Sequence, residues 1–256
     1  MGGHGSDANK GATGIKQSEQ GNVDGNPRAG LRPGFGRVLD GEMELTSRVR
    51  VKICGITNIR DALGAVSSGA DALGFNLYPG SKRYIDLEKN AAWMVQVPPL
   101  VTKVAVVVNL PLERALEVAA HPAVDLVQFH GDEDSEYCAR FAQSGRPFVK
   151  AIRLRGDQDV ERADRFSTPF VLVDAACGGA YGGTGKGVDL GLAIRVRERH
   201  PGLRLILAGG LSPENVGEAA VQVRPYAVDV ASGVEVAAPA KDLDLMRRFV
   251  AAVGGC

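Results

Sequence analysis

Cysteine, net charge and long apolar runs are all scarce in this chain of 256 residues. Without a run of about 18 apolar residues it cannot form a transmembrane helix, so we expect no membrane partner. Thirty basic and thirty acidic side chains cancel, which argues against a nucleic-acid partner, because phosphate backbones are bound by clustered Lys and Arg. The four cysteines form no C-x-x-C pair, which excludes a disulfide scaffold and disfavours a cysteine-based zinc site. Scattered thiols without a secretory signal predict a cytoplasmic protein.

The chain changes character near residue 47. Residues 1–47 hold eleven of the 33 glycines, few apolar residues and no apolar period of 2 or 3.6. Such a segment cannot bury enough surface to offset the entropy that ordering would cost. We therefore expect a disordered, Gly-rich N-terminal tail over 1–47 and a catalytic domain over 48–256.

From Arg48 onward, short runs rich in Val, Ile and Leu alternate with helical stretches. This order implies parallel strands joined by crossover helices. Eight such units predict a single (β/α)8 TIM barrel, with a doubly wound sheet as the alternative. The expected strands are 49–54, 72–77, 101–108, 126–130, 148–152, 170–174, 203–208 and 227–230. The helices are expected to start near Asn58, Asp86, Leu112, Glu133, Asp157, Asp189, Pro213 and Asp242.

Two of these helix starts carry capping signals. Asn58 can cap the first helix, with Asp61 three residues further on. Ser212 followed by Pro213 predicts a cap with proline at the first helical position.

Alternation along the strands sorts side chains between the helix layer and the barrel interior. In the first strand, Val51 and Ile53 suit the helix layer. The same alternation places six side chains capable of chemistry in the barrel interior, near the mouth formed by the carboxyl ends of the strands. Barrel enzymes have their active sites at this end. The six side chains are Lys52, Cys54, Gln128, His130, Asp174 and Asp229.

Each of these side chains also has a purely structural interpretation. A strand cysteine such as Cys54 is usually a small buried hydrophobe. Lys52 and Asp229 lie on strands that become neighbours on closure, so we favour a structural ion pair for them. His130 and Gln128 could satisfy loop amides, whereas the buried carboxylate of Asp174 is costly without a function or a partner.

Glycine clusters follow the last three expected strands. Backbone N–H groups in such loops bind phosphate, and glycine permits the close approach. We therefore expect a phosphate site at Gly209-Gly210 and Ser232-Gly233, the loops after the seventh and eighth strands. The cluster at 178–187 predicts a turn or a lid. It is not a P-loop, because Ala180 and Gly187 stand where that motif requires Gly and Ser or Thr.

Seven blocks of sequence resemble the phosphoribosylanthranilate isomerase family, in that family's order. They are KICGIT at 52–57, DALGF at 71–75 with YPGSKRYI at 78–85, VQFHG at 127–131, LVD at 172–174, GGTGK at 182–186, AGGLSPENV at 208–216 and VDVASGVE at 228–235. The chain departs from the family at four places: Ala231 replaces the usual Ser, Phe129 replaces Leu, Asn76-Leu77 replaces an apolar-aromatic pair, and 187–190 replaces Thr-Phe-Asp-Trp.

The resemblance implies an Amadori rearrangement in tryptophan biosynthesis, with a small phosphoribosyl substrate and a barrel that is a monomer or a homodimer. N-(5-phosphoribosyl)anthranilate would become 1-(2-carboxyphenylamino)-1-deoxyribulose 5-phosphate. The family's general base maps to Cys54, its general acid to Asp174 and its anthranilate-carboxylate contact to Arg83. Its phosphate contacts map to Gly209, Gly210, Ser232 and Gly233, and we add His130 and Gln128 as candidate substrate contacts.

The expected chemistry needs no cofactor and no metal, because the opened sugar forms an iminium that serves as the electron sink. It requires a protonated Asp174 and an ionised Cys54, so we expect the pKa of the acid to be shifted up and that of the thiol down, with help from Lys52, or small active fractions of each. Two alternatives remain at this stage. One is another phosphosugar isomerase or epimerase barrel, such as the analogous isomerase of histidine biosynthesis, which would have Asp in place of Cys54. An inactive barrel serving as a binding module would not need Cys54, Asp174 and Arg83 intact.

Overall fold

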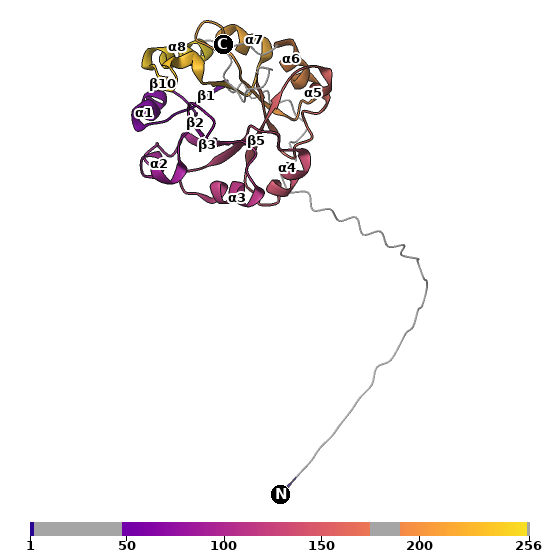
Figure 1. The fold of residues 1–256 in the computed structure, drawn as a ribbon. Helices are drawn as coiled ribbons and strands as arrows, with labels where there is room; N and C mark the ends of the chain where they lie inside the picture. The colour runs from indigo at the N-terminus through magenta and orange to yellow at the C-terminus, as the bar shows by residue number, and fades with distance from the viewer. Residues whose placement is uncertain (3–47, 175–189, 255–256) are drawn as a thin grey trace. The chain divides into compact units, whose positions relative to one another are not determined.

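Strands and helices alternate around a closed ring in the computed structural model, which describes residues 1–2, 48–174 and 190–254. The eight barrel strands pair in chain order, each parallel to the next, and β1 pairs with β8 to close the barrel. Figure 1 shows the helices following one another around the strands in the same order. Closure confirms the predicted (β/α)8 barrel and removes the doubly wound alternative. The expected lid over 178–187 and the expected tail, apart from Met1 and Gly2, lie outside the described residues.

The observed strands agree with the predicted ones to within two residues at each end. They are β1 Arg50–Cys54, β2 Ala72–Asn76, β3 Thr102–Val107, β4 Leu126–Phe129, β5 Phe148–Arg153, β6 Phe170–Asp174, β7 Arg204–Leu207 and β8 Ala227–Val230. These segments are rich in Val, Ile, Leu and Phe, which pack well on a pleated sheet with both faces buried.

The helices outside the strands are α1 Ile59–Ser67, α2 Leu87–Met94, α3 Leu112–Ala120, α4 Ser135–Ala142, α5 Asp157–Glu161, α6 Leu190–Arg199, α7 Val216–Val223 and α8 Leu243–Gly254. The cap predicted at Asn58 is confirmed, because its side chain accepts a hydrogen bond from the Asp61 backbone N–H. The cap predicted at Ser212 is wrong, since α7 begins only at Val216. The Asn215 side chain turns back instead, accepting from the Ser212 N–H and donating to the Gly210 carbonyl, and so holds a turn before the helix.

Two apolar layers hold the barrel together. Between strands and helices lie the residues of the helix-facing parity, among them Val51, Ile53 and Val173, all at most 1% exposed. Inside the barrel lies a smaller apolar cluster of Val149, Ala151, Leu172, Ile206, Ala208 and Ala227. Along β6, Leu172 and Asp174 therefore share the interior face, as the alternation predicted.

Phe129, which replaces a leucine usual in the family, lies at the centre of an aromatic cluster. Its ring meets those of Tyr137, Phe141 and Phe148 edge-on, with centroids 5.3, 4.9 and 5.4 Å apart. Edge-to-face pairs stabilise beyond their buried area by about 0.5–1.5 kcal/mol each. The Phe129 ring therefore packs in the outer layer, beside α4, and not in the apolar cluster of the barrel interior.

A small hairpin after β8 was not predicted. The 3-10 turn Ser232–Val234 leads into β9 Glu235–Ala237, which pairs antiparallel with β10 Ala240–Lys241. The hairpin brings Glu235 and Lys241 together. Among the described residues, no helix is long and apolar enough to cross a membrane.

Candidate active site

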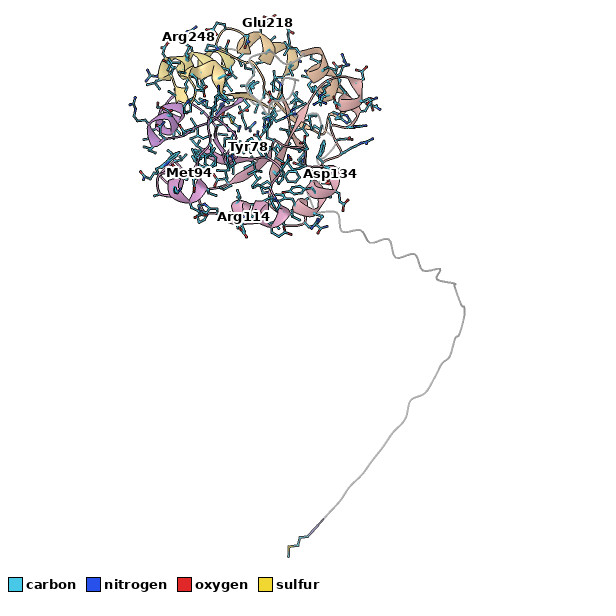
Figure 2. The ribbon with its side chains drawn as sticks, viewed as in Figure 1. Tyr78, Met94, Arg114, Asp134, Glu218 and Arg248 are labelled. Carbon is cyan, nitrogen blue, oxygen red and sulfur yellow. The ribbon has the colours of Figure 1, made fainter. Side chains whose placement is uncertain are left out.

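The carboxyl ends of the strands surround a cavity of about 90 Å³. Cys54 ends β1, Asp174 ends β6 and His130 follows β4 directly, and all three line it. The loops after β2, β7 and β8 contribute Arg83, Gly209, Gly210 and Ser232. Tyr78 also lines this cavity, and Figure 2 labels it near the middle of the ring, whereas Arg248 and Glu218 lie at the rim. Seven of the nine predicted site residues thus meet in one place.

The other two predicted site residues lie just outside this lining. Gly233 packs beneath the neighbouring loop, where an added Cβ would come within 1.9 Å of the Leu211 carbonyl oxygen. Gln128 is 1% exposed and lines a different cavity, of about 210 Å³, that includes residues of the strands' opposite ends such as Arg50 and Ala227. Gln128 therefore reaches the mouth only through the side chain of His130.

A buried ion pair lies directly under Cys54. Lys52 Nζ donates to Asp229 Oδ1 at 2.7 Å, and both side chains are less than a tenth exposed. The predicted pairing of these two residues is confirmed. Gly74 stands opposite Cys54 in the register of β1 and β2, and a Cβ there would meet the Cys54 sulfur at 2.6 Å and Lys52 Nζ at 3.0 Å. The absence of a side chain at Gly74 therefore makes room for the thiol and the lysine together.

The environment of Cys54 does not favour a preformed thiolate. Burial raises the pKa of the Cys54 thiol, because a desolvated sulfur resists charge. The ammonium of Lys52 acts in the opposite direction but does not outweigh burial, and the Asp229 carboxylate adds to the rise. The expectation of a lowered thiol pKa is therefore wrong. Lys52 is largely committed to Asp229, which, with Cys54, keeps the pKa of this buried lysine above its ordinary value.

Arg83 is held from one side by a buried carboxylate. Its Nε and Nη2 atoms donate to Glu235 Oε1 and Oε2 at 2.7 and 2.6 Å, in the two-pronged geometry that suits a guanidinium. Lys241 Nζ donates to the same Glu235 at 2.6 Å and to the Ala231 carbonyl at 2.9 Å. Burial acts to raise the pKa of Glu235, but the hydrogen bonds from Arg83 and Lys241 outweigh it, so the pKa of Glu235 lies below its ordinary value. The cluster carries one surplus positive charge beside the cavity.

The same cluster holds the loop that contains Ala231. The contact from this position to Lys241 is made by the backbone carbonyl, which any residue provides. A serine hydroxyl is therefore not needed to hold the loop after β8 against the hairpin.

His130 bridges Asp174 and Gln128. Its Nε2 lies 3.2 Å from Asp174 Oδ2, and its Nδ1 lies 2.9 Å from Gln128 Nε2. The loop behind His130 is fixed by a second buried ion pair, because Lys150 Nζ donates to Glu133 Oε2 and to the Gly131 carbonyl, each at 2.8 Å. The loop that follows His130 is therefore tied to β5 through Lys150.

The loops after β7 and β8 meet at the remaining side of the cavity. Gly209 and Gly210 have φ angles of 89° and 65°, a conformation that side chains disfavour. Gly233 packs against the carbonyl of Leu211, at the contact described above. Glycine is required here by backbone conformation at one loop and by close approach at the other. The two loops therefore bring their backbones into close contact beside the cavity.

A larger cavity of about 440 Å³ adjoins the first and shares His130 and Asp174 with it. It is lined by the ends of β5 and by α4 and α5, including Arg153 and Arg155. Cys54 and Arg83 line the smaller cavity and not this one.

Sequence reasoning missed four charged residues around the site: Glu133, Lys150, Glu235 and Lys241. Arg83 and Glu235 are 152 positions apart, and no local pattern connects them. The available signal was that one of the four, Lys150, lies within a predicted strand segment, where a charge needs a partner.

The family model for N-(5'phosphoribosyl)anthranilate (PRA) isomerase matches residues 51–252. The chain belongs to the phosphoribosylanthranilate isomerase family. An N-(5'-phosphoribosyl)anthranilate isomerase of Thermotoga neapolitana is 45% identical over 202 residues, which are 79% of this chain and 97% of the relative. The resemblance found in the sequence is thereby confirmed.

Solved structures of phosphoribosylanthranilate isomerases agree with this assignment. The crystal structure from Thermotoga maritima matches with a TM-score of 0.74 and 44% identity, over 81% of this chain and all of that one. Another, in complex with reduced 1-(o-carboxyphenylamino)-1-deoxyribulose 5-phosphate, matches with a TM-score of 0.70 and 41% identity over the same shares. The chain is therefore an isomerase of the (β/α)8 fold, as its sequence predicted.

Proposed function

We propose that the cavity at the strand ends converts N-(5-phosphoribosyl)anthranilate into 1-(2-carboxyphenylamino)-1-deoxyribulose 5-phosphate, with Asp174 as general acid and Cys54 as general base. The observation that carries the proposal is that both groups line one cavity with Arg83 and the glycine loops. An acid, a base and two anion-binding groups are what this rearrangement of a doubly anionic substrate needs. The proposed partner is this small molecule, and the proposed compartment is the cytoplasm.

The first step is ring opening. Asp174, protonated, gives its proton to the ring oxygen of the ribofuranose as the bond from that oxygen to C1 breaks. The lone pair of the anthranilate nitrogen forms a double bond to C1, which leaves an iminium. Asp174 becomes a carboxylate, and the bond to His130 Nε2 at 3.2 Å offers it a donor.

The second step is removal of the C2 proton. The Cys54 sulfur takes this proton, and the electrons of the C–H bond flow toward the iminium nitrogen to give an enolamine. Protonation at C1 and loss of the proton on O2 then yield the ketone. Because the pKa of the free thiol is raised, the positive iminium is well suited to favour the thiolate at the stage at which it is needed.

Two anionic ends fix the substrate. The surplus positive charge of the Arg83–Glu235–Lys241 cluster suits the anthranilate carboxylate, and Arg83 lines the cavity with part of its fork uncommitted to Glu235. The backbone of Gly209-Gly210 and Ser232-Gly233 suits the phosphate. His130 completes the cavity, while Gln128 acts through His130 rather than on the substrate.

Steady-state kinetics of Cys54→Ser and Asp174→Asn test the assignment. Each change keeps the shape and removes a proton-transfer group, so kcat should fall at least ~10²-fold, the low end for a positioned acid or base. Binding of the product, measured by titration, should change much less. Turnover within a few-fold of the unmodified protein in Cys54→Ser would remove the thiol from the mechanism. Failure of the unmodified gene to complement a tryptophan auxotroph lacking this isomerase would favour the inactive-barrel alternative.

A further inference from the structure

Three side chains form a hydrogen-bonded chain that leads from the proposed acid into the barrel interior. Asp174 lies at the cavity, His130 is in the middle, and Gln128 is buried at the far end. Gln128 does not line the mouth cavity and is separated from it by His130. Its role must therefore be exerted on the imidazole.

One atom of this hydrogen-bonded triad has no partner among the described residues. Gln128 Oε1 is buried and makes no hydrogen bond with any of the described residues, while its Nε2 faces His130 Nδ1 at 2.9 Å. In this orientation the amide donates, so a neutral His130 must accept at Nδ1 and carry its proton on Nε2. Nε2–H then donates to Asp174 as a carboxylate. His130 and Asp174 then hold one proton between them. It lies on His130, so Asp174 has none to give.

A half turn of the amide about its Cγ–Cδ bond reverses this pattern. The two ends of a carboxamide are nearly equal in size, and Gln128 borders the cavity of about 210 Å³, which gives it room to turn. Gln128 Oε1 would then accept from His130 Nδ1–H, and His130 Nε2 would share a second proton with Asp174. Gln128 Oε1 would then have a partner, Gln128 Nε2 would take the position without one, and Asp174 would hold a proton to give.

We propose that Gln128 is a positioning residue for the general acid, whose amide orientation selects whether the His130–Asp174 pair holds the proton that opens the ring. The proposal rests on the function proposed above. The proton delivered to the ring oxygen is the one shared by Asp174 and His130 Nε2. His130 keeps the Nδ1 proton, which Gln128 Oε1 accepts. After the transfer, the Asp174–His130 pair takes up a new proton from solvent.

Two substitutions separate this role from packing. The carboxylate of Gln128→Glu has the same shape as the amide but only accepts hydrogen bonds. It therefore fixes a proton on His130 Nδ1, which is the pattern in which Asp174 holds its proton. Gln128→Met keeps a similar side-chain volume but has no hydrogen-bond donor or acceptor that could fix the tautomer of His130. We expect kcat to fall about five- to tenfold in Gln128→Met, the worth of one hydrogen bond, with KM unchanged. Gln128→Glu should retain kcat within about twofold on the same scale.

The direct readout is the ¹⁵N spectrum of the imidazole of His130, which distinguishes Nδ1–H from Nε2–H without any substrate. Gln128→Glu should show Nδ1 protonated, and Gln128→Met should show a mixture of tautomers. Gln143→Glu, the same change at an exposed position at the end of α4, should leave both kinetics and spectrum as they are. If Gln128→Glu does not fold, Gln128→Met alone decides.

An unchanged tautomer ratio or an unchanged kcat in Gln128→Met would overturn the proposal. If the unmodified protein shows no isomerase activity, the proposed function fails, but the tautomer measurement still reports whether Gln128 controls His130.

Discussion

Cys54 is the residue whose environment has the clearest kinetic consequence. Because burial raises the pKa of its thiol, the thiolate fraction of the free protein at neutral pH is below that of an ordinary cysteine. If the thiolate is the base, kcat/KM should rise with pH beyond neutrality and into the ordinary thiol range, about 8.5. The measurement is kcat/KM across this range. A profile that is flat on the alkaline side would show that a different group takes the C2 proton.

Iodoacetamide labelling of Cys54, followed by peptide mass, gives an independent check on that profile. Alkylation requires the thiolate, so its rate should rise with pH in parallel with kcat/KM. Cys138 is a useful comparison, because burial raises the pKa of its thiol to about 12 and it should label far more slowly throughout.

Glu235 is predicted to matter through Arg83. In Glu235→Gln, an amide replaces one carboxylate oxygen and places N–H groups against two cations. Hydrogen bonds to charged groups contribute about 1.5–3 kcal/mol, so KM should rise roughly 10- to 100-fold, with a smaller change in kcat. The control is Glu136→Gln on the exposed face of α4, which should not alter KM. Equal KM values for the two variants would mean that Arg83 needs no support from Glu235.

At the scale of the elements, the strands could be predicted because their apolar runs are short and bounded, and β6 and β8 match to the residue. The start of α7 could not, because it depends on whether the Asn215 side chain folds back on Gly210 or leaves Ser212 to cap. The two strands of the β9–β10 hairpin have only five residues in all, too few for a period to emerge.

The candidate site was likewise predictable only in part. Parity and position at the strand ends identified Cys54, His130 and Asp174 as neighbours, since both follow from strand register alone. The sign of the Cys54 pKa shift did not follow. Lys52 and its partner Asp229 could be predicted from the sequence, but the depth of burial that outweighs the lysine could not.

The two loops that meet at Gly233 permit a test of the proposed phosphate site. Gly233→Ala would place a Cβ 1.9 Å from a backbone oxygen, so the loops must move apart. Such overpacking costs about 1–3 kcal/mol, a fall in Tm of roughly 2–10 °C, and KM should rise. Gly202→Ala is the matched control, because nothing lies within 4 Å of the added group. A normal KM in a destabilised Gly233→Ala protein would separate these loops from substrate binding.

At the scale of the whole molecule, closure of the barrel makes the site. Lys52 and Asp229 are 177 positions apart and pair only because β1 lies beside β8. The acid and its histidine come from β6 and β4, and the arginine and its carboxylate come from the loops after β2 and β8. No fragment of the barrel carries an acid, a base and both anion contacts, so activity and global folding should be lost together on denaturation.

The barrel should not need the first 45 residues. The family match begins at residue 51 and β1 at Arg50, while Arg48 still contributes by donating to Asp71 through two hydrogen bonds. A chain shortened to start at Thr46 keeps that contact, so its Tm, kcat and KM should equal those of the full chain. A chain starting at Arg50 loses it, and since Arg48 is exposed the cost should be at most about 1 kcal/mol, or roughly 2–4 °C in Tm. Thermal unfolding and kinetics of both chains provide the measurement. A fall of more than a few degrees in the chain starting at Thr46 would show that the N-terminal segment stabilises the barrel, against the expectation from its composition.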